Sequence, residues 1–145
     1  MAASKLRGIY VVLISIRENI LVKVGALGEI LFEKGLYAYV GSAQNNLEKR
    51  VKRHFRKNKP KFWHIDYLLE NKEAEIIEVY YKEAGKSEEC QVAGEIKEVS
   101  QPISGFGASD CSCISHLFKL NDPKSFRKIV QRNGLTKLEI NKVIN

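Results

Sequence analysis

Glu89 is the carboxylate in this sequence with the clearest potential for chemistry. On the helix expected over residues 87–99, Val92, Ala93 and Ile96 recur at helical spacing, and Glu89 falls at the centre of the same inward arc. Burying a carboxylate costs free energy unless its charge meets a cation, a metal ion or several hydrogen-bond donors. Glu89 is therefore either a ligand or a structural acid whose charge is satisfied inside the fold.

Arg50 and His54 lie on an earlier helix, which we expect over residues 46–57. A rotation of about 100° per residue puts His54 between Leu47 and Phe55 on the apolar arc and leaves Arg50 at the edge of that arc. An imidazole in this place can transfer a proton or bind a phosphate, and it equally suits a core histidine hydrogen-bonded to a tyrosine. The other basic residues of this helix point toward solvent or a phosphate backbone.

Basic residues are concentrated between residues 49 and 61, and Phe55, Phe62 and Trp63 lie among or beside them. The whole chain carries a formal net charge of +7, with a pI near 9.3. Each phosphate that a lysine or arginine neutralises releases counterions, so this charge favours a polyanionic partner. The basic segment is the predicted nucleic-acid footprint.

Cysteine supplies a second set of candidate ligands. Cys111, Cys113 and His116 could join Cys90 in a four-ligand zinc set, but structural zinc sites favour C-x₂₋₄-C spacing over the C-x-C found here. Buried thiols are the preferred interpretation, and zinc is the minor one. An odd number of cysteines does not resemble a secreted disulfide framework, so we expect a reducing compartment and a cytoplasmic protein.

The elements that position these side chains follow from apolar runs and turn residues. Residues 8–16 are almost all Ile, Val, Leu and Tyr, which predicts a buried strand carrying Tyr10. On the strand expected over residues 36–40, Tyr37 and Tyr39 share one face. Tyrosines on strands are usually packing residues. The complete prediction is strands over residues 8–16, 20–24, 29–32, 36–40, 75–82 and 115–120, and helices over 46–57, 62–69, 87–99, 123–131 and 135–143.

Two tripeptides, Gly8-Ile9-Tyr10 and Tyr39-Val40-Gly41, resemble the paired signature of the GIY-YIG endonucleases. Arg50 and His54 match the Arg-x-x-x-His helix that follows in that superfamily, and Glu89 occupies the place of its metal-binding glutamate. The later Gly-Phe-Gly and Ser-Asp-Cys-x-Cys-x-x-His strings resemble an uncharacterised stand-alone branch of the superfamily. Matches in the correct order are far more specific than any one tripeptide.

For the fold, the resemblance implies an α/β chain of the α+β kind, with a small central, mainly antiparallel three-stranded sheet flanked by helices. The family core would cover residues 8–99 of a single domain, residues 1–145. Residues 17–35 form a longer insert than the usual hairpin, and they either extend the sheet or cover the site. Residues 100–145 would form a C-terminal helical extension.

For the function, the resemblance implies a metal-dependent endonuclease that hydrolyses DNA phosphodiester bonds. Branched, flapped or damaged structures met in repair or recombination are the substrate class we consider. Tyr10 would deprotonate water with help from Tyr39, Glu89 would hold Mg²⁺ or Mn²⁺, and Arg50 would support the transition state. His54 completes the expected catalytic set. The residues expected to contact DNA are Lys49, Lys52, Arg53, Arg56, Lys57, Lys59, Lys61 and His64.

A second class of function is a nucleic-acid-binding module that keeps the nuclease fold without its chemistry, which the insert and the tail make plausible. In either case we expect a monomer and no membrane partner. No run in the sequence approaches the roughly 18 apolar residues that a membrane span needs.

Overall fold

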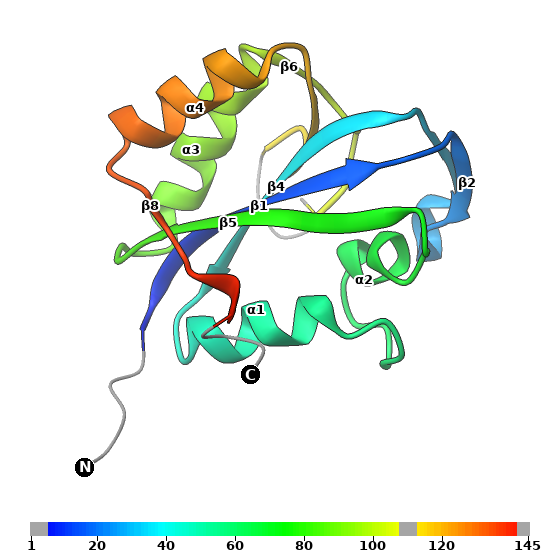
Figure 1. The fold of residues 1–145 in the computed structure, drawn as a ribbon, viewed down its shortest axis with the longest axis horizontal. Helices are drawn as coiled ribbons and strands as arrows, with labels where there is room; N and C mark the ends of the chain where they lie inside the picture. Colours follow the sequence, from blue (N-terminus) through cyan, green and yellow to red (C-terminus); the bar gives the residue numbers. More distant parts are fainter. Residues whose placement is uncertain (1–5, 108–112, 142–145) are drawn as a thin grey trace.

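A six-stranded antiparallel sheet forms the centre of the computed structural model, which describes residues 6–107 and 113–141 (Figure 1). Its strand order is β6-β7-β4-β1-β5-β8. The strands are β1 (Gly8–Ile16), β4 (Gly35–Ala43), β5 (Ala74–Lys82), β6 (Ser100–Pro102), β7 (Leu117–Leu120) and β8 (Thr136–Lys137).

The expected small three-stranded sheet is wrong. β4, β1 and β5 form the middle of the sheet, but β7 and β6 extend it beyond β4, and β8 pairs with the outer edge of β5. β6 and β8 are too short to show a period-2 pattern, so no local sequence pattern predicts them. Their extended conformation follows from pairing with an edge that would otherwise leave backbone groups unsatisfied.

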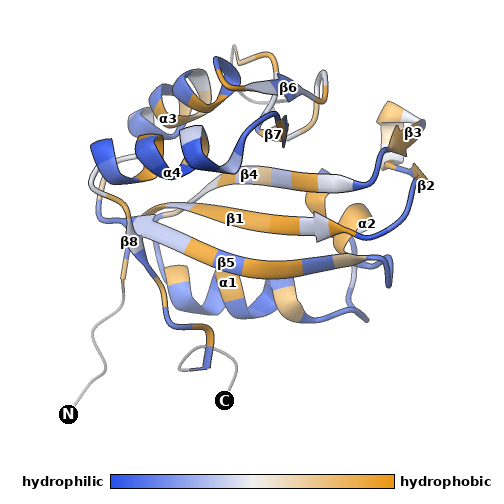
Figure 2. Cartoon of the chain, turned by 45° about the horizontal axis from the view of Figure 1, so that its top comes forward, coloured by the Kyte–Doolittle hydropathy of each residue, from blue (hydrophilic) through white to orange (hydrophobic). Residues whose placement is uncertain are grey.

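Two layers of helices cover the two faces of the sheet (Figures 1 and 2). Along β1, Ile9, Val11 and Leu13 pack with the apolar side chains of α3 (Ser87–Lys97) and α4 (Pro123–Arg132). Alternate residues, among them Tyr10 and Val12, pack on the other face with α1 (Leu47–Phe55) and α2 (His64–Leu69). The central strand is therefore buried on both sides, as its continuous apolar run predicts.

The buried faces of α1 and α3 agree with the prediction from their helical wheels. In α1, Leu47, Val51 and His54 are buried. In α3, the buried set is Glu89, Val92, Ala93 and Ile96.

The N-cap of α1 is Asn46, whose side-chain oxygen accepts the backbone N–H of Lys49 at 3.0 Å. The spacing of Asn45 and Glu48 predicts a capping box that begins at Asn45, but the helix is capped one residue later, by the Asn46 side chain. The preceding asparagine lines the pocket described below.

The insert between the tyrosine strands forms a ribbon of its own. β2 (Ile20–Lys23) pairs with β3 (Glu29–Phe32) in a separate two-stranded sheet, and the 3₁₀ turn η1 (Gly25–Leu27) joins them. The insert therefore does not extend the main sheet. Val24 and Phe32 of the insert are fully buried in the core, where Phe32 packs beside Tyr37.

The C-terminal region is only partly helical. α4 begins at Pro123, and its N-cap Asp122 accepts the Lys124 backbone N–H, as the Asp-Pro pair predicts. The helix expected over residues 135–143 is wrong in its first part, because Thr136–Lys137 form β8. Within the residues that the structure describes, no helix has the length and apolar character needed to cross a membrane.

Candidate active site

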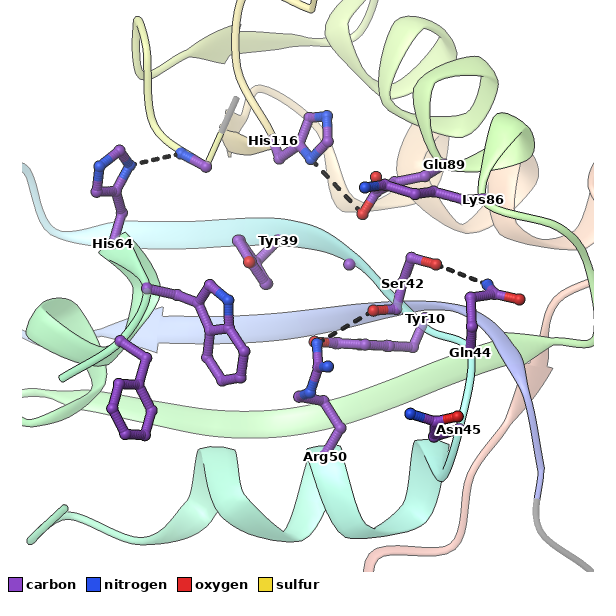
Figure 3. A pocket seen from close by; sticks show the side chains of 14 residues that line it. Tyr10, Tyr39, Ser42, Gln44, Asn45, Arg50, His64, Lys86, Glu89 and His116 are labelled. Atoms are coloured by element: carbon purple, nitrogen blue, oxygen red, sulfur yellow. Dashed lines mark hydrogen bonds and ion pairs between the residues drawn. The ribbon is translucent and has the colours of Figure 1, made fainter. Parts of the chain in front are cut away.

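A pocket of about 520 Å³ opens beside the end of β4 and is lined by residues from both helical layers (Figure 3). Arg50 reaches it from α1 on one side of the sheet, and Glu89 reaches it from α3 on the other. Tyr10 and Tyr39 project from the sheet between them. Four of the predicted catalytic residues therefore line one cavity although they come from four different elements.

The glycine of the second tripeptide is required by the tyrosine of the first. β1 and β4 pair so that Tyr10 lies opposite Gly41. A Cβ added to Gly41 would lie 2.5 Å from the Tyr10 ring and 2.5 Å from its hydroxyl oxygen. Gly8 is equally constrained, since a Cβ there would approach the Lys82 carbonyl oxygen to 2.0 Å. The two glycines therefore let the strands and the phenol approach closely.

His54 lies behind Tyr10 and is bonded to it. The Tyr10 hydroxyl and His54 Nε2 are 2.7 Å apart, and both side chains are buried. Burial lowers the pKa of His54 to about 3, so the ring is neutral at physiological pH. Its Nδ1 has no hydrogen-bond partner among the described residues. This is the geometry of a core histidine bonded to a tyrosine, the second of the two roles that the sequence left open.

Burial also dominates the acidity of the two tyrosines. It raises the pKa of Tyr10 well above its usual value, although the nearby Arg50 guanidinium opposes this shift. The pKa of Tyr39 is raised by burial as well, and the charge of Glu89 adds to the effect. Both phenols therefore hold their protons at neutral pH unless further positive charge enters the pocket.

Glu89 brings negative charge to the wall of the pocket. Its side chain is 9% exposed, and its Oε2 lies 3.8 Å from Nδ1 of His116, which is also buried. His116 belongs to the segment that leads into β7, and sequence reasoning considered it only as a zinc ligand. A buried carboxylate that faces a polar cavity is a suitable oxygen ligand for a hard cation.

Arg50 is held in place on the opposite side. Its Nη1 donates to the Ser42 carbonyl oxygen at 3.1 Å, and its guanidinium carbon lies 4.4 Å from the centre of the Trp63 ring. Arg53 also packs on Trp63, at 4.6 Å. These contacts fix the Arg50 guanidinium at the pocket while leaving its charge available to an anion.

Several predicted DNA-contacting residues have partners within the fold. Arg53 donates to Asp66 Oδ1 at 2.8 Å. The ammonium groups of Lys57 and Lys59 cap backbone carbonyls, and burial lowers the pKa of Lys59 to about 8. Lys61 forms a salt bridge with Glu70 at 2.8 Å.

The remaining residues of that predicted set divide into two kinds. Lys49 and Lys52 are exposed on α1, and Arg56 is exposed at its C-cap. His64 lines the pocket and accepts the Gly107 backbone N–H through Nδ1 at 2.9 Å. The DNA contacts stay a prediction. The exposed basic residues named above and the pocket-lining His64 are the best-placed candidates for them.

Sequence reasoning missed the organising role of Asp66. This fully buried carboxylate accepts from Arg53 and from the backbone N–H groups of Phe62 and Trp63, and these bonds hold its pKa below the usual value despite burial. It thereby positions the aromatic pair at the pocket mouth. The available signal was its place three residues after Trp63, since an acid at this position of a helix can accept the backbone N–H of the N-cap residue.

Next to Glu89, the fold assembles a group able to hold a metal ion. Cys90, Cys113 and His116 bring their ligand atoms within 4.8 Å of one another. Cys111, the fourth member of the set considered from the sequence, lies outside the described residues.

Comparison with known proteins adds a family without an assigned activity. The family model described as "Domain of unknown function DUF123" matches residues 9–138, and the chain belongs to this family. No curated protein and no solved structure gives a significant match.

Proposed function

We propose that this DUF123 chain is a metal-dependent DNA endonuclease of the GIY-YIG type. The observation that carries the proposal is the convergence of Tyr10, Tyr39, Arg50 and Glu89 on one polar pocket from four separate elements. Two of these residues lie in the tripeptides that resemble the nuclease signature, and the Gly41 contact with Tyr10 gives that signature a physical reason. Packing alone does not require an arginine and a carboxylate to face the same cavity.

Among the residues that the structure describes, Glu89 is the carboxylate that lines the pocket, and it fits Mg²⁺ or Mn²⁺. Mg²⁺ takes oxygen ligands, keeps several of its waters and is commonly completed by a substrate phosphate. Bound there, the ion would polarise the phosphoryl group and neutralise charge on its oxygens. With one carboxylate ligand, affinity for the ion should be weak until DNA is present.

Arg50 would stabilise the charge that develops on the phosphoryl oxygens during in-line attack. The Ser42 carbonyl and the Trp63 ring fix its guanidinium before substrate binds, so little reorganisation is needed in the transition state. A preorganised donor of this kind typically contributes a factor of about 10² to 10³ in rate.

Tyr10 would orient the attacking water and accept its proton. Because burial raises the pKa of Tyr10, the phenol can act as a base only when positive charge near its oxygen lowers that pKa. Arg50 is the described cation that already acts in this direction. The bond to neutral His54 holds the hydroxyl in position.

The pocket mouth supports a substrate with unpaired bases. Phe62 is 71% exposed and Trp63 is 37% exposed, and both line the pocket beside the two arginines. Base stacking on such rings is worth about 1–3 kcal/mol per base and requires a base that is not already stacked in a duplex. Flapped, branched or single-stranded DNA is therefore the preferred class.

Cleavage of a DNA panel with Mg²⁺ or Mn²⁺ tests the proposal. Glu89→Gln and Tyr10→Phe should each lower the cleavage rate by about 10² to 10³. Glu88→Gln is the matched control, because Glu88 lies on the same helix but pairs with Lys82 at 2.6 Å on the surface. Activity that survives both site substitutions would reject the assignment.

A non-catalytic binding module is the competing function. The observation that favours it is the burial of Tyr10, which keeps the proposed base protonated in the isolated protein. Tight binding to the whole panel without cleavage by either ion would establish this alternative. Phe62→Ala should weaken binding to flapped DNA more than binding to duplex DNA. That result would support base stacking at the pocket mouth whether the protein is a nuclease or a binding module.

A further inference from the structure

We propose that Cys90, Cys113 and His116 bind a zinc ion that braces the wall of the pocket. Cys90 belongs to α3, whereas Cys113 and His116 belong to the segment before β7. Their ligand atoms lie within 4.8 Å of one another, and His116 is buried. The proposal concerns a second ion and does not depend on nuclease activity.

The spacing of these three atoms suits a tetrahedral ion. With Zn–S near 2.3 Å and Zn–N near 2.0 Å, adjacent ligand atoms in a tetrahedral site lie about 3.5–3.8 Å apart. The described atoms reach that spacing with shifts of about 1 Å or less. A water molecule can complete the coordination, as in other sites with two cysteines and one histidine.

The chemistry of the ligands separates this ion from the one proposed at Glu89. Two thiolates and an imidazole are soft or borderline ligands that select zinc, whereas Mg²⁺ requires oxygen. The C-x-C spacing that argued against zinc does not apply here, because the two sulfurs within the group come from Cys90 and Cys113 in different elements.

His116 connects the proposed ion to the pocket. Its Nδ1 lies 3.8 Å from Glu89 Oε2, and a carboxylate beside a metal-bound histidine is a recurrent arrangement that fixes the ring and raises its basicity as a ligand. Two thiolates would balance the two charges of zinc, so the ion would add little net charge beside Glu89. The carboxylate then keeps its own charge for the pocket.

The backbone around His116 shows what the ion would brace. The His116 N–H donates to the Phe106 carbonyl at 2.7 Å, and its own carbonyl accepts the Val40 N–H at 2.9 Å. The segment is thus bonded to β4 and to the Gly-Phe-Gly turn, while Cys90 belongs to α3. An ion bound by both would fix the distance between Glu89 and the sheet.

The zinc content of the purified chain is the direct test. Protein purified without chelator should hold about one zinc per chain, measured by plasma mass spectrometry. Cys90→Ser, Cys113→Ser and His116→Asn should each lower zinc affinity by about 100-fold or more, because changes behind the ligands already cost 10–100-fold. The exposed neighbours Gln91 and Ile114 supply the controls Gln91→Ser and Ile114→Ser, which should retain the ion.

Two measurements on the unaltered chain keep the proposal falsifiable if a variant does not fold. Co²⁺ should produce a thiolate charge-transfer band and the visible spectrum of a tetrahedral ion. Zinc should also slow alkylation of Cys90 and Cys113 by at least 10-fold, mapped by peptide mass spectrometry. Equal alkylation with and without zinc, a Cys90–Cys113 disulfide, or a chain that binds no Co²⁺ would overturn it. Each result is independent of DNA cleavage, so the two proposals can fail separately.

Discussion

The floor and the rim of the pocket differ in what controls their charge. The floor, formed by Tyr10 and Tyr39 with His54 behind Tyr10, is buried, and burial favours the neutral form of each group. The rim, formed by Arg50, Phe62 and Trp63, reaches solvent and keeps a full positive charge packed on an aromatic ring. The floor can therefore position a reactant, but the positive charge that attracts and stabilises a phosphate must come from the rim and from a cation held by Glu89.

The largest expected effect comes from the tight packing of the floor, which should make it more sensitive to an added methyl group than the exposed side of α3. Gly41→Ala should destabilise the protein by about 1–3 kcal/mol, because its Cβ would overlap the Tyr10 ring at 2.5 Å. Gly94→Ala is the matched control on α3, where the Cβ meets nothing within 4 Å. That change should stabilise the helix by about 0.5–1 kcal/mol. Denaturant unfolding measures both, and an equal response would show that the floor is not closely packed.

The neutral His54 predicts a specific dependence of stability on pH. Its folded pKa of about 3 lies below the ordinary value of 6.5, so the unfolded chain binds more protons between these values. The contribution of neutral His54 to the free energy of unfolding is complete above pH 6.5. It is lost as the pH falls toward 3, at about 1.4 kcal/mol per pH unit. Urea unfolding from pH 7 to 4.5 should show this slope in the wild type.

The variant His54→Gln isolates that slope from other titrating groups. Over the same pH range, the free energy of unfolding should depend on pH more steeply in the wild type than in the variant, and the difference in slope should correspond to about one proton. Tyr10→Phe should keep the slope, because its phenol does not titrate there. If the two slopes are equal in wild type and His54→Gln, the histidine is not buried in its neutral form.

The smallest expected effect concerns the outer charges near the rim. Lys52→Gln combined with Arg56→Gln should lower the slope of log affinity against log salt by about 2 for duplex DNA, since each neutralised phosphate contributes about 0.9. The control pair is Lys97→Gln with Lys128→Gln, exposed on the opposite helical layer. A larger change in the salt slope for the control pair would indicate that DNA binds at α3 and α4 instead.

Arg53 shows what the structure adds to the sequence. The helical wheel grouped Arg53 with Lys52 and Arg56, but Arg53 is bonded to Asp66 and to the Pro60 carbonyl at 2.7 Å. Removing Arg53 would disturb the rim as well as any phosphate contact. Periodicity predicts which face a side chain leaves from, and it does not predict which group a long flexible side chain will meet.

Much of the fold was predictable where an element has a clear period. β1 and β3 have their expected bounds, and Glu89 and His54 are buried as their helical arcs predict. The elements that were missed are the short edge strands, and the central strand β4, expected over residues 36–40, is longer and runs from Gly35 to Ala43. β8 was expected as part of a helix, because the pairing that makes Thr136 and Lys137 extended lies more than fifty residues away on β5. Local pattern contains no information about such a partner.

The sequence by itself determined the central strands, the inward faces of two helices and the residues available for chemistry, because periodicity and residue type are local properties. Only the tertiary structure decided that Tyr10 bonds to His54, that Arg50 faces the same pocket as Glu89, and that Cys90 lies beside His116. Burial set the pKa of His54 and of both tyrosines, and burial depends on how the helical layers close over the sheet. Distances between segments far apart in the chain follow from that closure.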